Sequence, residues 1–247
     1  MNSYDSNGKL ASVVWATPNA EPMIAYIARV TSENQENPEY IRLFRYLIEH
    51  GHWSPFEHAS VCIEINTSRA VAAQILRHRS FSFQEFSQRY RDVTQKPLFP
   101  EQRFAAKTNR QGSIDVEDPS KLTPEQKDAL NMANFSLDWV WGSYRNLILN
   151  GFAPETARMI LPMCSGTRIY MTGNIRSWIH YLELRLADDT QKEHRAVAQA
   201  ILKELESVIP NIIKMMNWRK HDEQREKDKP VSVESDCGVN ESGDKGR

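Results

Sequence analysis

The chain has 247 residues, of which 40% are hydrophobic and 26% charged, a composition typical of one globular domain or a domain with a subdomain. Its formal net charge of −1 disfavours a dedicated nucleic-acid-binding protein, because such proteins usually carry a strongly basic face. No apolar run approaches the ~18 residues that cross a bilayer, and the N-terminus lacks the pattern of a secretion signal. The three cysteines fit no disulfide framework or metal spacing, so we expect a cytoplasmic protein without a membrane span.

The first half of the chain alternates predicted strands and helices. Its apolar periodicity predicts a strand at 9–16, helices at 22–30 and 38–49, a strand at 61–65 and a helix at 68–76. Ser68 is expected to cap the last of these helices, and Gly51 is a typical residue just past a helix end. Residues 92–122 are polar and irregular, which favours a long surface loop.

The second half is richer in helix. Its pattern predicts helices at 123–150, 154–162 and 174–186, a strand at 167–172, and a long helix at 191–218 that bends at Pro210. The first of these helices opens on a capping box at Thr123 and Gln126. Strands lie between helices rather than in one block, so the fold class is α/β or α+β. We expect one domain over 1–218 and a charged, disordered tail over 219–247.

An arginine-rich segment carries the strongest chemical signal. Arg77-His78-Arg79 is followed, after seven residues, by Ser87-Gln88-Arg89. Guanidinium groups hold phosphates and carboxylates in two-point contact, and three of them together favour a bound anion. The alternative is a solvated face on which Glu85 and Asp92 pair with the arginines.

A second segment, 50–58, contains three histidines and Glu57, which invites a metal-site interpretation. The spacing of His50, His52 and His58 matches neither a His-Glu-x-x-His helix nor a zinc finger, and Pro55 would break such a helix. We therefore predict no metal and favour a loop whose polar side chains bind a polar ligand.

Two predicted helices add further polar groups. Gln74 lies one turn before Arg77 and is expected on the same helix face, although it could simply face solvent. On the helix at 174–186, Arg176, His180 and Arg185 form a polar stripe, which is either an ordinary solvated face or one wall of an anion-binding cleft. Cys164 has no neighbouring histidine and is interpreted as a structural thiol.

Taken together, these segments resemble the flavin-dependent thymidylate synthase family, the ThyX type. The resemblance covers roughly residues 20–205 and depends on separated motifs. These are Arg-His-Arg and Ser-x-Arg at 77–89, Gly-His-x-Ser-Pro-Phe-Glu-His at 51–58, Ala-Arg-x-x-Leu-Pro at 157–162, Asn-x-Arg-Ser at 174–177 and Leu-Arg at 184–185.

The resemblance implies a ThyX-like fold with a core of antiparallel strands flanked by helices, and a single catalytic domain. It also implies a homotetramer whose active sites are shared between subunits. The implied reaction is the reductive methylation of dUMP to dTMP, with 5,10-methylenetetrahydrofolate as carbon donor, FAD as hydride carrier and NADPH as reductant.

Residue by residue, the resemblance also implies site roles. Flavin contacts are expected from His52, Ser54, Glu57, Arg77, His78, Arg79, Ser80, Asn174, Arg176, His180 and Leu184. The dUMP pocket is expected to contain Gln74, Arg77, Glu85, Phe86, Ser87, Gln88, Arg89, Arg158 and Arg185. The chain departs from many relatives at Asp189-Thr190, where they carry His-Ala, so the flavin contact of that histidine is missing here.

The chemistry of the implied reaction suggests a separate role for each candidate catalytic residue. Carbon 5 of uracil becomes nucleophilic only when negative charge builds up on the ring, and Arg185 is expected to stabilise that charge while Arg158 helps to fix the base. Arg77 and Arg89 are expected on the phosphate. Ser87 lacks a neighbouring base, so we favour a binding role for it over that of a nucleophile.

Two other classes of function remain open from the residues alone. An RNA or single-strand binder would use Arg77, Arg79, Arg89 and Arg91 with Phe81, Phe83, Phe86 and Tyr90 as stacking groups. A metal-dependent hydrolase would be built on His50, His52 and His58. The near-neutral charge disfavours the first and the ligand spacing disfavours the second.

Overall fold

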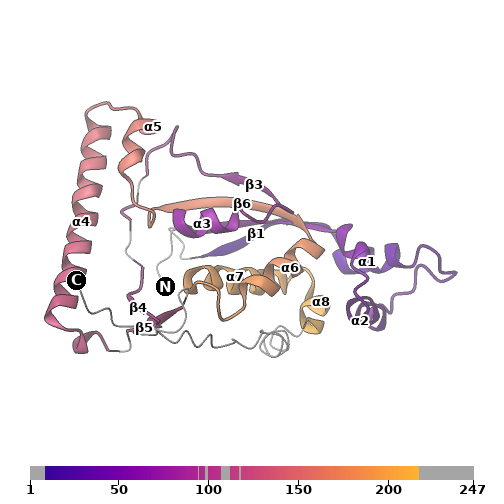
Figure 1. Ribbon diagram of the computed structural model, residues 1–247. Helices are drawn as coiled ribbons and strands as arrows, with labels where there is room; N and C mark the ends of the chain where they lie inside the picture. The colour runs from indigo at the N-terminus through magenta and orange to yellow at the C-terminus, as the bar shows by residue number, and fades with distance from the viewer. Residues whose placement is uncertain (1–8, 94, 98–99, 107–111, 117, 217–247) are drawn as a thin grey trace, which may run out of the picture.

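The computed structural model of the chain describes residues 9–93, 95–97, 100–106, 112–116 and 118–216. A four-stranded sheet forms its centre (Figure 1), with the order β1 (Ala11–Ala16), β2 (Ser60–Ser68), β6 (Gly166–Asn174) and β3 (Ser82–Glu85). All three strand pairs are antiparallel. The predicted α+β fold with an antiparallel core and flanking helices is therefore confirmed.

Two helices leave opposite ends of the central strand pair. Ser60 pairs with Asn174 and Ser68 with Gly166, so β2 and β6 match along their whole length. Ser68 then caps α3 (Arg69–Ile75) by accepting the Val71 N–H, as predicted. Asn174 caps α6 (Ile175–Arg185) in the same way through the Ser177 N–H. Both helices lie on one side of the sheet (Figure 1), and their C-terminal ends come together.

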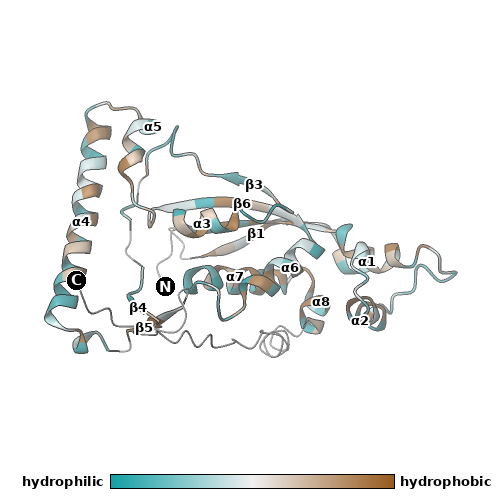
Figure 2. Ribbon diagram, viewed as in Figure 1, coloured by the Kyte–Doolittle hydropathy of each residue, from teal (hydrophilic) through white to brown (hydrophobic). Residues whose placement is uncertain are grey.

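That covered face of the sheet holds the main core. Along β6 the buried residues alternate, with Ile169 and Met171 pointing inward, while Arg168 on the opposite face is exposed. Trp178 and Tyr181 of α6 are completely buried against it, and the Trp178 indole donates to the Val61 carbonyl. The same core includes residues of β1 and α7 (Lys192–Leu205), and Figure 2 shows apolar residues along β1, α6 and α7.

Short helices lie at one end of the sheet: α1 (Ala20–Ala28), α2 (Ile41–Glu49), the 3-10 turn η1 (Ser54–Glu57) and α8 (Pro210–Met215). The buried Glu21 carboxylate joins two of them, because it accepts hydrogen bonds from the backbone N–H groups of Asn211 and Ile212 at the start of α8. These donors have no partner within a helix, so the carboxylate satisfies them.

At the other end, α4 (Pro124–Leu149) stands upright beside α5 (Pro154–Ala157) and the 3-10 turn η3 (Arg158–Ile160) (Figure 1). A second small core joins Val93, Tyr144 and Ala157. The predicted capping box at Thr123 is confirmed. The remainder of α4 presents large apolar side chains to solvent: Met132, Phe135 and Trp139 are each about 70% exposed.

Several predicted elements differ from the structure. The strand β3 was not predicted, and the predicted loop at 92–122 contains the hairpin of β4 (Arg103–Ala105) and β5 (Ser113–Asp115) and the 3-10 turn η2 (Pro119–Lys121). The helix predicted at 154–162 is shorter, as α5 and η3. The predicted helix at 191–218 is not one bent helix: α7 ends at Leu205 and α8 starts at Pro210, because proline fits the first helical turn but not the interior. The predicted tail at 219–247 lies outside the described residues.

Within the ranges that the structure describes, no helix is both long and apolar enough to span a membrane.

Candidate active site

The converging ends of α3 and α6 place His78 against Arg185. The Arg185 Nε–H donates to the His78 Nε2 atom across 2.9 Å. Burial, helped by the charge of Arg185, lowers the pKa of His78 to about 4. The imidazole is therefore neutral at physiological pH and can accept this hydrogen bond. It thereby holds the half-buried Arg185 side chain through its Nε atom.

Next to this pair, Gln74 contacts a histidine that the sequence reasoning did not select. The Gln74 side-chain oxygen lies 3.0 Å from Nδ1 of His194 on α7, and Nε2 of His194 lies 3.1 Å from the Tyr181 hydroxyl. His194 is completely buried, and burial lowers its pKa to about 3, with Arg185 adding to the effect. The only signal for His194 in the sequence was a lone histidine near the start of the helix predicted at 191–218.

A cleft of about 510 Å³ lies beside the N-terminal half of α6. Five predicted flavin residues line it: Glu57, Ser80, Asn174, Arg176 and His180. The Arg176 guanidinium forms an ion pair with the Glu57 carboxylate, which links the 51–58 loop to α6. Trp53, Ser177, Ile179 and Glu183 also line the cleft and were not selected, although Trp53 and Ser177 lie inside the quoted motifs.

The remaining predicted flavin residues do not line this cleft. They are His52, Ser54, Arg77, His78, Arg79 and Leu184. The His52 ring lies 6.1 Å from that of His50, and Tyr46 stacks on His50. Within the described part of the chain, no group of three or more His, Cys, Asp or Glu residues is arranged to hold a metal ion.

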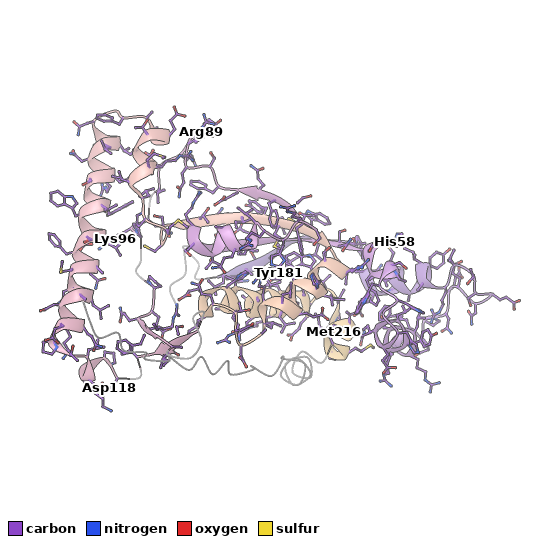
Figure 3. All side chains as sticks on the ribbon, viewed as in Figure 1. His58, Arg89, Lys96, Asp118, Tyr181 and Met216 are labelled. Atoms are coloured by element: carbon purple, nitrogen blue, oxygen red, sulfur yellow. The ribbon has the colours of Figure 1, made fainter. Side chains whose placement is uncertain are left out.

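The second half of the predicted substrate pocket lies elsewhere, beside α5. Arg89 forms an ion pair with Glu155 at 3.1 Å, and Figure 3 places Arg89 close to α5. The Ser87 hydroxyl accepts the Arg89 backbone N–H at 3.4 Å. Gln88 is buried, and its Nε2 atom, like the Nε atom of Arg158, has no hydrogen-bond partner among the described residues. Such buried, unpartnered donors are costly, so they favour a ligand nearby.

Glu85 and Phe86 connect this region to the sheet. The Glu85 carboxylate accepts from Arg69 at 3.1 Å and from the Thr167 hydroxyl at 2.9 Å. The Phe86 backbone N–H donates to the Arg168 carbonyl at 2.8 Å. Sequence reasoning missed Arg69, which follows directly after the predicted helix cap.

The arginines therefore do not form the single cluster that the sequence suggested. No hydrogen bond or ion pair between described residues joins Arg77 or Arg79 to Ser87 or Arg89 within one chain. The alternative pairing with Glu85 is also wrong, because Glu85 binds Arg69. The cause is β3, which carries the chain along the edge of the sheet and away from the end of α3.

The fold also bears on the alternative functions. Phe81 is buried edge-on against Trp178 and Phe83 packs against the core, so neither ring forms a stacking platform for bases. Of the four proposed stacking rings, Tyr90 is the one that is largely exposed. Burial raises the pKa of the Cys164 thiol, as expected for a structural cysteine.

Comparison with known proteins identifies the family. The family model described as thymidylate synthase complementing protein (Thy1) matches residues 12–211. The chain is 45% identical to the flavin-dependent thymidylate synthase of Synechocystis over 80% of its own length and 90% of the relative's. It is 43% identical to the probable flavin-dependent thymidylate synthase of Paramecium bursaria Chlorella virus 1, over 83% and 94% of the two chains.

Solved structures agree with the fold. The UMP/dUMP methylase PolB of Streptomyces cacaoi, bound with 5-Br dUMP, superposes with a TM-score of 0.70 at 24% identity over 83% of this chain and 93% of its own. The same enzyme bound with 5-Br UMP gives a TM-score of 0.69 at 25% identity, covering 83% and 92%. The match over residues 12–211 and the identity to the cyanobacterial and viral relatives show that the chain belongs to the thymidylate synthase complementing protein family, which includes flavin-dependent thymidylate synthases.

Proposed function

We propose that the protein is a flavin-dependent thymidylate synthase, a methyltransferase that converts dUMP to dTMP. The observation that carries this proposal is that one helix, α6, carries both a polar cleft along its N-terminal half and the Arg185–His78 pair at its C-terminal end. Family membership over residues 12–211 and the names of the two relatives support the same reaction.

The residues of the cleft fit a flavin. Arg176 and His180 offer groups for the negative charge of a dinucleotide, while Ser80 and the amide of Asn174 offer neutral hydrogen bonds. The Asn174 oxygen is occupied by its cap on α6, so its Nδ2 group is the one available. Bound FAD would supply hydride transfer to the substrate carbon, for which the protein provides binding and orientation.

At the nucleotide, the chain's own residues have separate tasks. Arg185, held by neutral His78, would stabilise negative charge on a uracil carbonyl oxygen as carbon 5 becomes nucleophilic. Gln74 would hydrogen-bond the base, while Arg77 and Arg89 would bind the phosphate together with Ser87. Arg158 and Gln88 would complete the pocket, because their buried donors lack partners among the residues that the structure describes.

We further propose a homotetramer with shared active sites. Gln74 and Arg185 lie at the ends of α3 and α6, whereas Arg89 lies beside α5 (Figure 3), so a complete dUMP pocket needs residues from a second copy. The exposed apolar residues of α4 offer a surface for that copy. The proposal also includes a single catalytic domain over residues 1–218, methylenetetrahydrofolate as carbon donor and NADPH as reductant, in the cytoplasm.

A direct assay tests the proposal. The purified protein is expected to be yellow, with a visible flavin band, and to form dTMP from dUMP, methylenetetrahydrofolate and NADPH, with less product when FAD is removed. Colourless protein that neither takes up FAD nor forms dTMP under these conditions would overturn it. Steep salt-dependent binding to oligonucleotides in that case would favour the nucleic-acid alternative.

A further inference from the structure

The amide of Gln74 belongs to a line of hydrogen bonds that reaches outside the proposed pocket. Its Nε2 atom lies 2.6 Å from Oε1 of Gln191, and Nε2 of Gln191 lies 2.8 Å from Oε2 of Glu193. Glu193 also binds Arg103 at 2.5 Å, and the Arg103 side chain is 12% exposed. This row of hydrogen bonds therefore starts at a half-buried ion pair between β4 and α7 and ends at Gln74.

The chemistry of these groups fixes which partner donates in each hydrogen bond between Glu193 and Gln74. An ionised carboxylate accepts hydrogen bonds and cannot donate, so Gln191 must turn its NH2 group toward Glu193. The Gln191 oxygen then faces Gln74, which must in turn donate through its own NH2 group. Burial acts to raise the pKa of Glu193, but the hydrogen bonds from Gln191 and Arg103 outweigh it and lower the pKa below its ordinary value.

The orientation of the Gln74 amide in turn fixes the hydrogen bonds of the buried His194. With its NH2 group facing Gln191, Gln74 presents its oxygen to Nδ1 of His194, so the proton of this neutral imidazole must lie on Nδ1. The unprotonated Nε2 then accepts a hydrogen bond from the Tyr181 hydroxyl. One carboxylate thus sets the tautomer of a histidine that it does not contact.

The segment that departs from the family pattern supports this arrangement. At Asp189-Thr190 the turn after α6 is closed by two hydrogen bonds of Thr190, from its hydroxyl to the Leu184 carbonyl at 3.1 Å and from its backbone N–H to the Ala187 carbonyl at 3.0 Å. Gln191 follows this turn directly, so the turn holds Gln191 in position to bind Gln74.

We propose that Glu193 is a positioning residue that, through Gln191, orients the Gln74 amide so that the second N–H of its NH2 group is presented to a hydrogen-bond acceptor of the ligand. Gln74 is half-buried, so part of its side chain is accessible to a ligand. A pyrimidine carbonyl oxygen is the matching acceptor, and this part of the inference depends on the proposed function.

The sharpest test replaces the carboxylate by its amide, Glu193→Gln. Arg103 can only donate hydrogen bonds, so the oxygen of the new amide would face Arg103 and its NH2 group would face Gln191. Donor and acceptor would then exchange roles in each hydrogen bond from residue 193 through Gln191 and Gln74 to His194. His194 would then carry its proton on Nε2 rather than Nδ1. Nitrogen NMR of the full-length chain with labelled histidine distinguishes these tautomers, and the variant His194→Asn identifies the signal.

The expected result is the Nδ1–H tautomer in the unchanged protein and the Nε2–H tautomer in Glu193→Gln. An Nε2–H tautomer in the unchanged protein, or no change in the variant, would overturn the proposal. This experiment needs no substrate, so its outcome is separate from that of the proposed function.

Kinetics of the FAD-loaded enzyme provide the second readout. Glu193→Gln is expected to raise KM for dUMP about tenfold with kcat little changed, since the lost contact is a ground-state hydrogen bond. Gln191→Met removes the hydrogen bonds between Glu193 and Gln74 while keeping the Arg103–Glu193 ion pair, and we expect the same change in KM from it.

Glu206→Gln, at an exposed carboxylate just past the end of α7, is the matched control and should have no effect. Unchanged KM in both Glu193→Gln and Gln191→Met would overturn the positioning role, whereas an unchanged protein that forms no dTMP would contradict the proposed function instead.

Discussion

The Nε atom of Arg185 lies 2.9 Å from Nε2 of His78, although the two residues are 107 positions apart in the sequence. Because this bond uses the inner nitrogen of the guanidinium, the outer nitrogens remain for a ligand. A neutral imidazole is suited to this task, since a protonated one would repel the arginine.

Loss of this guanidinium should therefore reduce turnover strongly. For Arg185→Ala we expect kcat/KM for dUMP to fall by a factor that corresponds to about 2.7–4 kcal/mol, the range for removal of one donor that stabilises developing negative charge. Steady-state kinetics with saturating FAD measure it. Arg185→Lys keeps a charge without the planar fork and should be intermediate, and turnover near that of the unchanged enzyme in Arg185→Ala would reject the assignment.

Ser87 is expected to be dispensable for the chemistry. Its hydroxyl accepts the Arg89 backbone N–H, and no described histidine or lysine hydrogen-bonds to it as a base. Ser87→Ala should thus keep measurable dTMP synthesis with a higher KM for dUMP. Complete loss of product together with intact binding of dUMP and FAD would instead identify Ser87 as a nucleophile.

The buried His194 should make the fold sensitive to acid. Its pKa is about 3 in the folded protein and close to 6.5 when unfolded, so the unfolded state binds more protons throughout that window. The contribution of His194 to stability is therefore full above pH 6.5 and falls as the pH decreases toward 3, with a slope of at most about 1.4 kcal/mol per pH unit.

Urea denaturation of the unchanged protein and of His194→Asn, at pH 7.5 and at pH 5.5, measures this contribution. The unchanged protein should lose more free energy of unfolding between the two conditions than the variant does. His78, whose pKa is also lowered, contributes equally to both proteins and cancels in the comparison. Equal pH dependence of the two proteins would contradict a buried neutral His194.

A methyl group at Gly173 should destabilise the fold. A Cβ atom built there would lie 2.4 Å from Cδ1 of Phe81 and 2.5 Å from Cε1, and Phe81 is itself packed edge-on against Trp178 at 4.8 Å between ring centroids. Gly173→Ala is therefore expected to cost about 1–3 kcal/mol of the free energy of unfolding, measured by urea denaturation. In a Phe81→Ala background the added cost should be much smaller, and an equal cost in both backgrounds would show that the clash is not the cause.

The exposed face of α4 predicts an effect on assembly. Trp139 is 70% exposed and lies on the same side of the helix as Phe135. A charge in an apolar interface is costly, so Trp139→Glu should shift the protein from the proposed tetramer to smaller species in light scattering after gel filtration. Trp139→Tyr keeps the apolar surface and should keep the assembly. A tetramer that persists in Trp139→Glu would place the interface elsewhere.

Local signals allowed much of this fold to be predicted. The cap at Ser68 and the capping box at Thr123 each depend on residues three positions apart, and both are confirmed. The strand β3 has no such signal, because its four residues become a strand only by pairing with β6, more than 80 positions later.

The candidate site likewise contains both contacts between residues selected from the sequence motifs and contacts that no local signal indicated. The motif residues Glu57 and Arg176 were selected, and the structure brings them together as an ion pair. His194 belongs to no motif, and its contact with Gln74 spans 120 positions, so neither periodicity nor spacing could reveal it. The pairing of Arg89 with Glu155 likewise depends on where α5 packs.

The antiparallel match of β2 and β6 also restricts how this protein can be altered in length. The helices that follow the two strands start at opposite ends of the pair, and their last turns meet at His78 and Arg185. One inserted residue in either helix would rotate its end by about 100° and advance it by about 1.5 Å. A length change in α3 would therefore need a compensating change in α6 to keep the contact between His78 and Arg185. The same changes before β1 would not affect this contact.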